Sequence, residues 1–269
     1  MARHKHLPST LAALAVASLL SSTALAQAAP AAPAPDWTFA GNLGLYSQYV
    51  FRGVSQTNEK PAIQGGFDLG HKSGFYLGTW GSNVSWLSDA VPDASSSMEW
   101  DFYGGYKGSL PNDFGYDLGV LYYWYPGSFP DGYVKADTTE LYAGLSWKTV
   151  SLKYSYSANN KTFGFPDSRG SGYLDLTASY DVVDKVSDAI GKVTLLGHVG
   201  HQWYTGETNG FANSNYEYTD WKVGAATEIY GVTVGVYYTD TDADNALYTN
   251  RFGKKLADSQ FVGYIQKTF

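Results

Sequence analysis

Two histidines are the first residues in this chain whose types and spacing suggest chemistry. His198 and His201 lie three residues apart, and Thr208-Asn-Gly210 follows them. A histidine serves nucleophilic catalysis only when a nucleophilic side chain lies within hydrogen-bond reach. No serine stands where it could act as the nucleophile beside these histidines. In addition, residues three apart on a strand point to opposite faces. We therefore expect two wall histidines without a catalytic role.

Metal chemistry is suggested by one acidic segment, Asp240-Thr-Asp-Ala-Asp-Asn245, which is similar to the start of a calcium-binding loop. The segment lacks the glycine at the sixth position and the glutamate at the twelfth that such loops use. Cysteine is absent, so thiolate metal sites are unavailable. We predict a solvated acidic loop, with weak divalent-cation binding as the open alternative. The sequence points to no catalytic residue, cofactor or dedicated metal site.

Charged side chains at alternate positions of apolar segments are the third feature. Between residues 114 and 125, Phe114, Leu118 and Trp124 share an apolar face, while Asp117 lies on the opposite face. Such period-two alternation is typical of strands with one apolar and one polar face. The same reading places these charged residues on the polar, inward face: Arg52, Asp68, Glu99, Asp101, Lys107, Asp117, Glu140, Lys148, Lys153, Asp175, Asp220, Lys222 and Glu228.

Twelve such segments must position these side chains. We predict strands at 37–52, 61–70, 75–86, 98–107, 114–125, 137–148, 151–158, 172–183, 192–205, 218–229, 231–240 and 259–269. Short turns alternate with longer polar loops at 87–97, 126–136, 159–171, 206–217 and 241–258. Outer-membrane barrels have an even strand number, short periplasmic turns and longer external loops. The predicted fold is all-β: a transmembrane antiparallel up-and-down β-barrel of about twelve strands, with its aromatic-rich face toward lipid.

The first 36 residues have a different character. Arg3 and Lys5 precede an apolar run that is too short to span a bilayer, and Ala24-Leu25-Ala26 is an A-x-A cleavage site. We predict a signal peptide at 1–26, cleaved near Ala26, and an Ala/Pro-rich tether at 27–36. The barrel would then occupy 37–269. Export followed by barrel assembly predicts the bacterial outer membrane as the location.

Composition excludes one class of partner. Without Arg3 and Lys5, the 18 Lys and Arg residues fall to 16 against 25 Asp and Glu, a net charge of −9. Binding of nucleic acid needs clustered Lys and Arg, so we expect no nucleic-acid partner. The high counts of 23 Tyr, 8 Trp and 30 Gly favour a transmembrane barrel or a secreted all-β domain over a helical enzyme.

The final strand, 259–269, predicts how such a barrel is assembled. Phe261, Ile265 and Phe269 share one face, and the chain stops on the aromatic Phe269. This segment resembles the terminal strand that the barrel assembly machinery recognises. We therefore expect that machinery as a partner through Phe269, with outer-membrane lipids around the finished barrel.

Specific motifs carry a family resemblance. They are Ser47-Gln-Tyr-Val-Phe-Arg-Gly-Val-Ser-Gln-Thr57, Pro61-Ala-Ile-Gln-Gly-Gly66, Gly74-Phe-Tyr-Leu-Gly-Thr-Trp-Gly-Ser-Asn83, Glu99-Trp-Asp-Phe-Tyr-Gly-Gly-Tyr106, Tyr122-Tyr-Trp-Tyr-Pro-Gly127 and Thr139-Glu-Leu-Tyr-Ala-Gly144. These motifs closely resemble the TorF-type putative porins of proteobacteria, once described as a domain of unknown function. The resemblance covers essentially the whole mature chain. It implies an outer-membrane barrel and passive transport of small hydrophilic solutes.

The predicted lumen has more acids than bases, which favours a mild preference for cations if water passes. Arg52 would either pair with an inward carboxylate such as Asp68 or line a constriction near the outer rim. Barrels with few strands are also often filled by their own side chains. A non-conducting structural or adhesive barrel therefore remains the first alternative. A lipid-modifying enzyme is the second, because some twelve-stranded outer-membrane barrels are phospholipases.

Overall fold

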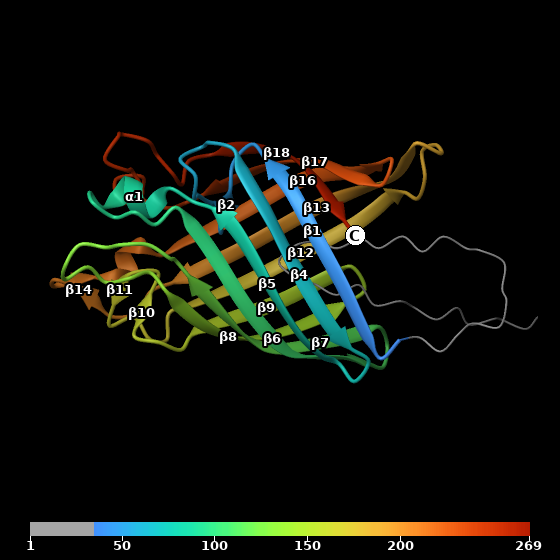
Figure 1. Ribbon diagram of the computed structural model, residues 1–269, viewed down its shortest axis with the longest axis horizontal. Helices are drawn as coiled ribbons and strands as arrows, with labels where there is room; N and C mark the ends of the chain where they lie inside the picture. The colour runs from blue at the N-terminus through green and yellow to red at the C-terminus, as the bar shows by residue number, and fades with distance from the viewer. Residues whose placement is uncertain (1–34) are drawn as a thin grey trace, which may run out of the picture.

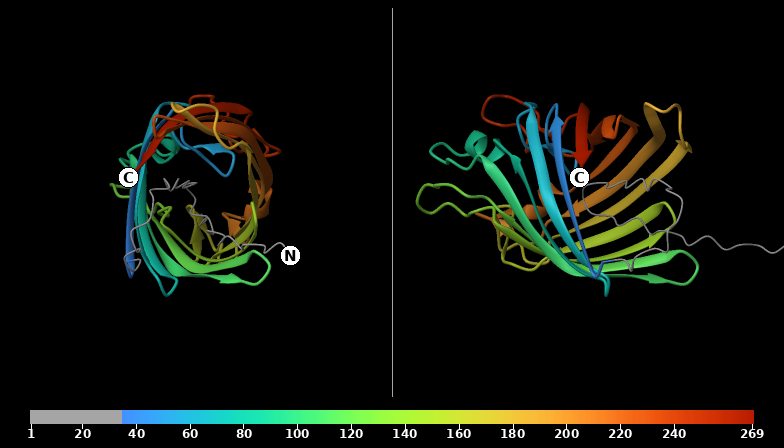
Figure 2. Two further views of the ribbon diagram at one scale, coloured as in Figure 1. Left: turned by 90° about the vertical axis from the view of Figure 1, so that its right-hand side faces the viewer. Right: turned by 45° about the vertical axis from the view of Figure 1, so that its right-hand side comes forward.

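The computed structural model describes residues 35–269 as one closed ring of antiparallel strands (Figures 1 and 2). The predicted twelve-stranded barrel is confirmed. Its strands, listed in order around the ring, are β1 (Trp37–Tyr46), β18 (Gln260–Thr268), β17 (Val232–Thr241), β16 (Tyr218–Ile229), β13 (Ile190–Trp203), β12 (Gly172–Val183), β9 (Val150–Ser157), β8 (Thr138–Trp147), β7 (Phe114–Trp124), β6 (Met98–Leu110), β5 (Phe75–Asn83) and β4 (Ala62–His71).

The outer face of the wall is apolar along the strands. Phe39, Leu77 and Val223 are 68%, 57% and 53% exposed, respectively, although each lies within a barrel strand. Cross-strand aromatic pairs cover this face, as where the Phe39 and Phe67 rings stack at 5.6 Å. A soluble protein hides such side chains in its core, whereas a barrel in lipid presents them outward. Alternation therefore leaves the polar residues facing the lumen.

The two ends of the barrel differ in the length of their connections. At one end, here called the turn end, the strands are joined by short connections at 72–74, 111–113, 148–149, 184–189 and 230–231. At the other, the loop end, the connections at 47–61, 84–97, 125–137, 158–171, 204–217 and 242–259 are long. Lys148 and Tyr230 have positive φ angles of 51° and 49°, as two-residue hairpin turns require. The predicted alternation of turns and loops is confirmed.

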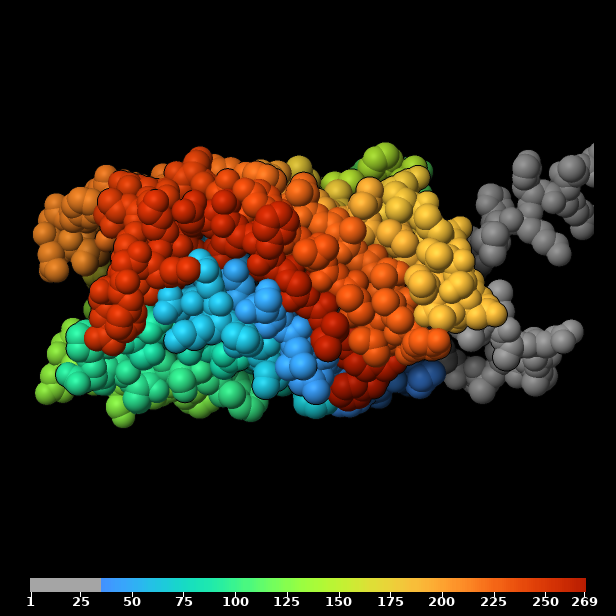
Figure 3. All heavy atoms as spheres, turned by 90° about the horizontal axis from the view of Figure 1, so that it is seen from above, coloured from blue at the N-terminus to red at the C-terminus, as the bar shows by residue number. Residues whose placement is uncertain are grey.

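The barrel closes where its first and last strands meet. β1 and β18 pair from Asn42↔Thr268 to Tyr46↔Tyr264. Beyond the ladder, Phe269 and Gly41 exchange backbone hydrogen bonds of 2.8 and 2.9 Å. Figure 3 shows the blue atoms of the N-terminal strand beside the red atoms of the C-terminal one along this seam. The terminal segment therefore completes the wall as its alternation predicts.

Two predicted strands leave the wall at least three residues earlier than expected. The first strand leaves the wall after Tyr46 instead of continuing to residue 52, and a small hairpin of β2 (Val50–Phe51) and β3 (Val54–Ser55) follows it. β5 ends at Asn83, and Trp86 begins the short helix α1 (Trp86–Ala90). The loops also carry the hairpins β10 (Lys161–Thr162)–β11 (Phe165–Pro166) and β14 (Glu207–Thr208)–β15 (Phe211–Ala212), and the 3-10 helix η1 (Asn213–Tyr216).

The predicted signal peptide at 1–26 and most of the tether at 27–36 lie outside the described residues. Among residues 35–269, no helix has the length and apolar character needed to cross a membrane.

Candidate functional site

The β2–β3 hairpin, here called the inner hairpin (residues 50–55), folds into the lumen at the loop end. Its turn is formed by Arg52 and Gly53, whose φ angles of 48° and 78° match the two-residue type I′ turn. Backbone bonds from Ser55 to Leu256 and from Gln56 to Tyr49, both 2.8 Å, hold its base. The light-blue segment that projects inside the ring in the left view of Figure 2 is this region of the chain.

The turn of the inner hairpin touches the wall on one side. A Cβ atom added at Gly53 would lie 2.4 Å from Thr241 Cγ2 and 2.7 Å from Asp220 Cβ. Only glycine combines this close approach with the left-handed backbone that the turn needs. The hairpin is therefore packed tightly against β16 and β17.

Arg52 extends from the turn to two further strands of the ring, β8 and β13. Its Nη2 donates to both carboxylate oxygens of Glu140 on β8 at 2.8 Å, and its Nη1 donates to Gln202 Oε1 on β13 at 2.8 Å. The Arg52 and Glu140 side chains are only 7% and 2% exposed. Hydrogen bonds between a guanidinium and a carboxylate are charge-assisted and are stronger than bonds between neutral groups. Arg52 therefore fastens the inner hairpin across the lumen.

Aromatic rings surround the same guanidinium. The Arg52 Cζ atom lies 4.2 Å from the centre of the Tyr173 ring, 4.7 Å from that of Phe51 and 5.6 Å from that of Phe163. Phe163, in the β10–β11 hairpin of another loop, also packs edge-on against Phe51 and Tyr123 at 5.5 and 5.1 Å. Two loops that are far apart in sequence therefore meet over the lumen around Arg52.

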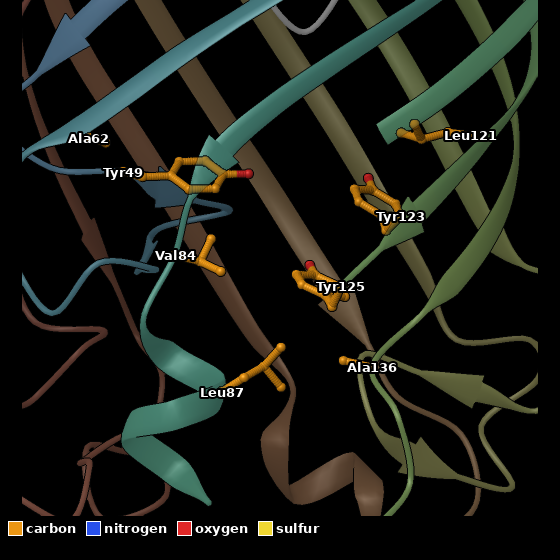
Figure 4. Packing of buried hydrophobic residues seen from close by; sticks show 8 residues of the cluster. All are labelled: Tyr49, Ala62, Val84, Leu87, Leu121, Tyr123, Tyr125 and Ala136. Carbon is orange, nitrogen blue, oxygen red and sulfur yellow. The ribbon is translucent and has the colours of Figure 1, made fainter. Parts of the chain in front are cut away.

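A second buried carboxylate lies beside the inner hairpin. Glu99, 1% exposed, accepts hydrogen bonds from the Tyr49 hydroxyl at 2.7 Å and the Tyr125 hydroxyl at 2.8 Å. Both tyrosines lie in loop-end connections, where burial and the nearby Glu99 carboxylate raise the phenol pKa well above its ordinary value. They therefore remain protonated donors at physiological pH. Figure 4 shows Tyr49, Tyr123 and Tyr125 in one cluster with Val84 and Leu87.

The lumen toward the turn end is more open. Asp68 and Asp117 are half-exposed, and each accepts a hydrogen bond from a tyrosine: Tyr103 at 2.7 Å and Tyr76 at 2.6 Å, respectively. Lys107 is exposed at this level, with its Nζ 5.0 Å from the centre of the Tyr76 ring. Charged side chains here keep contact with solvent, whereas Glu99, Asp101 and Glu140 near the loop end do not. The lumen is thus sealed in one half and polar and accessible in the other.

His198 and His201 face opposite sides of β13, as predicted. His198 is inward and lies between Asp220 at 2.8 Å and Asp175 at 3.3 Å. His201 bonds Thr219 at 2.9 Å and packs against Trp203. Neither histidine has a serine hydroxyl among its hydrogen-bond partners in residues 35–269. Within the same residues, no group of three His, Asp or Glu side chains is arranged to hold a metal ion.

The structure brings some predicted lumen residues together and separates others. Arg52 pairs with Glu140, so the suggested pairing with Asp68 was wrong. Asp220 joins the His198 network and also accepts a 2.7 Å hydrogen bond from Tyr173. Lys148 does not line the lumen: it lies exposed in the β8–β9 turn with its Nζ 4.6 Å from the centre of the Trp147 ring.

The remaining predicted residues occupy the inner face of the wall. Asp101 is buried near the loop end, two residues after Glu99 on β6, and its Oδ1 atom has no hydrogen-bond partner among the described residues. Lys222 is half-buried on β16, with its Nζ 5.1 Å from the centre of the Tyr237 ring. Sequence reasoning missed the uncharged partners of Arg52, which are Gln202, Tyr173 and Phe163. The Arg52-Gly53 dipeptide between apolar residues was the available signal for the inward turn.

The family model described as "Bacterial protein of unknown function (Gcw_chp)" matches residues 28–269. The chain belongs to this family. No curated protein sequence matches the chain.

Three solved structures are similar in fold. The KdgM porin is 9% identical with a TM-score of 0.50, and the match covers 86% of this chain and 99% of that one. KdgM in complex with disordered oligogalacturonate is 9% identical with a TM-score of 0.47, over 86% and 99% of the two chains. An outer membrane channel from Pseudomonas putida F1 is 14% identical with a TM-score of 0.47, over 88% and 97%. The likeness to the KdgM porin agrees with the barrel fold.

Proposed function

We propose that this protein is an outer-membrane diffusion channel for small hydrophilic solutes, closed at its outer entrance by the inner hairpin. In such barrels the long loops face outward, so the loop end is the external one and the turn end faces the periplasm. The observation that carries the proposal is the half of the lumen near the turn end. There, Asp68, Asp117 and Lys107 remain solvent-accessible inside a closed wall. Charged, hydrated linings of this kind set solute selectivity in pores.

The proposal also covers export and assembly. A signal peptide at 1–26 and recognition of Phe269 by the assembly machinery would deliver the barrel, at 37–269, to the outer membrane. The resemblance to TorF-type putative porins supports the same location and a passive mechanism. It also supports a channel that uses neither a cofactor nor chemical catalysis.

Solute selectivity follows from the charges of the lumen. The accessible acids of the lumen wall, Asp68, Asp117, Asp175 and Glu228, outnumber the accessible bases, Lys107, Lys153 and Lys222. A wall of low dielectric constant focuses the field of these groups along the pore. We expect a weak preference for cations that grows as the salt concentration falls.

Planar-bilayer recording of the purified barrel tests the proposal. Heat-modifiable gel mobility first establishes that the protein is folded. The native channel should show small or infrequent conductance steps, because the hairpin closes it, and the Arg52→Ala variant should show larger or longer ones. A folded protein that neither conducts nor swells liposomes in either form would contradict the channel.

The rival function is a filled structural barrel, and one observation favours it. Tyr49, Leu87, Tyr123 and Tyr125 form a packed cluster with the inner hairpin, and all are less than 9% exposed. A permanent plug of this kind would make the barrel a support for its external loops. The Arg52→Ala recording separates the two functions, since a permanent plug would not open when a single ion pair is removed.

A further inference from the structure

The guanidinium of Arg52 occupies a site whose walls come from other parts of the chain. Glu140 supplies two carboxylate oxygens and Gln202 one amide oxygen, all at 2.8 Å. The Tyr173 and Phe163 rings lie on strand β12 and on the β10–β11 hairpin, at 4.2 and 5.6 Å from Cζ. These four side chains are here called the guanidinium cage. Two of them accept hydrogen bonds from the edge of the planar cation, and the two rings lie against its faces.

Two further buried carboxyl groups lie beside the cage. Tyr123 donates to Glu140 at 3.2 Å, and in the β6–β7 ladder its register partner is Asp101. Asp101 is 7% exposed and its Oδ1 atom has no partner among residues 35–269. Glu99, two residues before Asp101 and 1% exposed, is bonded only by neutral phenols. Three buried carboxyl groups therefore lie near the guanidinium of Arg52, and Glu140 is the one that forms an ion pair with it.

We propose that the guanidinium cage is a binding site for solutes that carry a guanidinium group, and that Arg52 is its tethered occupant. A free solute of this class takes the place of the Arg52 side chain and releases the inner hairpin from β8 and β13. The role of such a solute as an opener rests on the proposed channel function, whereas the binding site itself does not. No cage residue lies on the hairpin, so the cage walls remain in the barrel when the hairpin is displaced.

A free guanidinium must compete with the tethered Arg52 side chain, and this competition sets the concentration needed for binding. A group held by a short tether has an effective concentration of about millimolar. The native protein should therefore need free guanidinium at roughly that concentration or above before the hairpin is released. Removal of the Arg52 side chain should leave the cage free and lower the concentration needed for binding by about tenfold or more.

The binding test uses the detergent-solubilised full-length barrel and guanidinium chloride, with total ionic strength held constant by sodium chloride. Calorimetric titration of Arg52→Ala should show saturable binding, whereas urea, which has a similar shape and no charge, should not bind. Arg52→Gln provides a second empty-cage variant if the Ala variant does not fold. Adding Glu140→Gln should weaken binding at least tenfold, while adding Asp68→Asn, a lumen carboxylate that accepts a bond from Tyr103, should leave it unchanged.

Two results would overturn the site: no saturable binding to either folded empty-cage variant, or binding that survives Glu140→Gln unchanged. Conductance then separates the site from the channel. If Arg52→Ala conducts but guanidinium neither binds nor blocks it, the site is wrong and the channel stands. If guanidinium binds the variant but no form of the protein conducts, the site stands and the channel is wrong. Native channels opened by millimolar guanidinium, and not by equal sodium, would support both.

Discussion

The two halves of the lumen are built from the same alternating strands but differ in what fills them. Near the loop end, Glu99 and Glu140 are 1% and 2% exposed and are bonded by tyrosines and by Arg52. Near the turn end, Asp68 and Asp117 are half-exposed and each has one tyrosine partner. The difference comes from the inner hairpin, since only the loop end has long connections that reach inward. Wall residues thus make a polar tube, and a loop decides whether it is closed.

The largest expected effect comes from breaking the ion pair that fastens the hairpin. Glu140→Gln or Arg52→Ala leaves an uncompensated buried charge, which costs about 3–5 kcal/mol of stability in typical cases. Both variants should lose heat resistance and gain conductance, as measured by gel shift against temperature and by bilayer recording. The double variant should be more stable than the sum of the two losses predicts. Lys107→Ala is the control, because it removes a lumen charge without touching the hairpin. If it changed heat resistance and conductance equally, the proposed difference between the two halves of the lumen would be refuted.

Gly53→Val should displace the hairpin while all charges are kept. The added side chain meets Thr241 and Asp220 at under 3 Å and forces a strained left-handed backbone of φ 78°. Left-handed strain alone costs about 1–2 kcal/mol. Gly210→Val is the matched control, because Gly210 also has φ 78° but nothing lies within 4 Å of its added Cβ. Conductance should rise for the first variant only, and a rise for both would show that loop strain acts without contact to the wall.

Tyr49→Phe and Tyr125→Phe test the loop-end half of the lumen at Glu99, the second buried carboxyl group. Each removes one hydrogen bond to the buried Glu99 carboxyl group, and a buried acceptor that loses its partner costs about 1–3 kcal/mol. Each variant should lower the temperature of the heat-dependent gel shift, and the double variant should lower it most. Tyr76→Phe, next to the solvent-accessible Asp117, should have a smaller effect. An equal loss in all three would mean that exposure does not distinguish the two halves.

Substitutions in the half of the lumen near the turn end should have a smaller effect, and it should appear in charge selectivity. Asp117→Asn and Asp68→Asn each remove one half-exposed negative charge, so cation preference should fall modestly and more at low salt. Reversal potentials under a salt gradient, measured in the Arg52→Ala background to ensure conduction, give the answer. Selectivity that is unchanged in both variants would place these carboxylates outside the permeation path.

The smallest expected effect is that of Lys148→Ala. This residue lies exposed in the β8–β9 turn and not on the lumen wall. Its removal should change neither selectivity nor heat resistance beyond about 0.5 kcal/mol, as is usual for surface substitutions. A clear shift of the reversal potential in this variant would mean that the β8–β9 turn itself contributes to selectivity.

The sequence was sufficient to predict the wall. Apart from the first strand, every barrel strand begins and ends within three residues of its predicted bounds. Period-two alternation in lipid leaves no choice about which face is apolar, so strand positions and the inward side of Asp68, Asp117 and His198 follow from local pattern. Lys148 lies in a turn, where the alternating pattern stops and no longer assigns a side chain to either face. Its assignment to the lumen was therefore wrong.

The predicted path of the first strand failed for a related reason. Residues 47–52 continue to alternate, yet the chain turns inward after Tyr46 because Arg52 and Gly53 form a tight turn. The partners of that turn, Glu140 and Gln202, are 88 and 150 residues away from Arg52. No local pattern specifies contacts over such separations.

By itself, then, the sequence determined a closed polar tube in an apolar wall, because both properties depend on the side chains of single strands. Only the tertiary structure decided that buried side chains fill the loop end of the lumen. This arrangement required an arginine from the first loop to meet a carboxylate on β8, an amide on β13 and rings from β12 and a distant hairpin. A buried charge is stable only where several partners converge on it, and that convergence is a property of the assembled barrel.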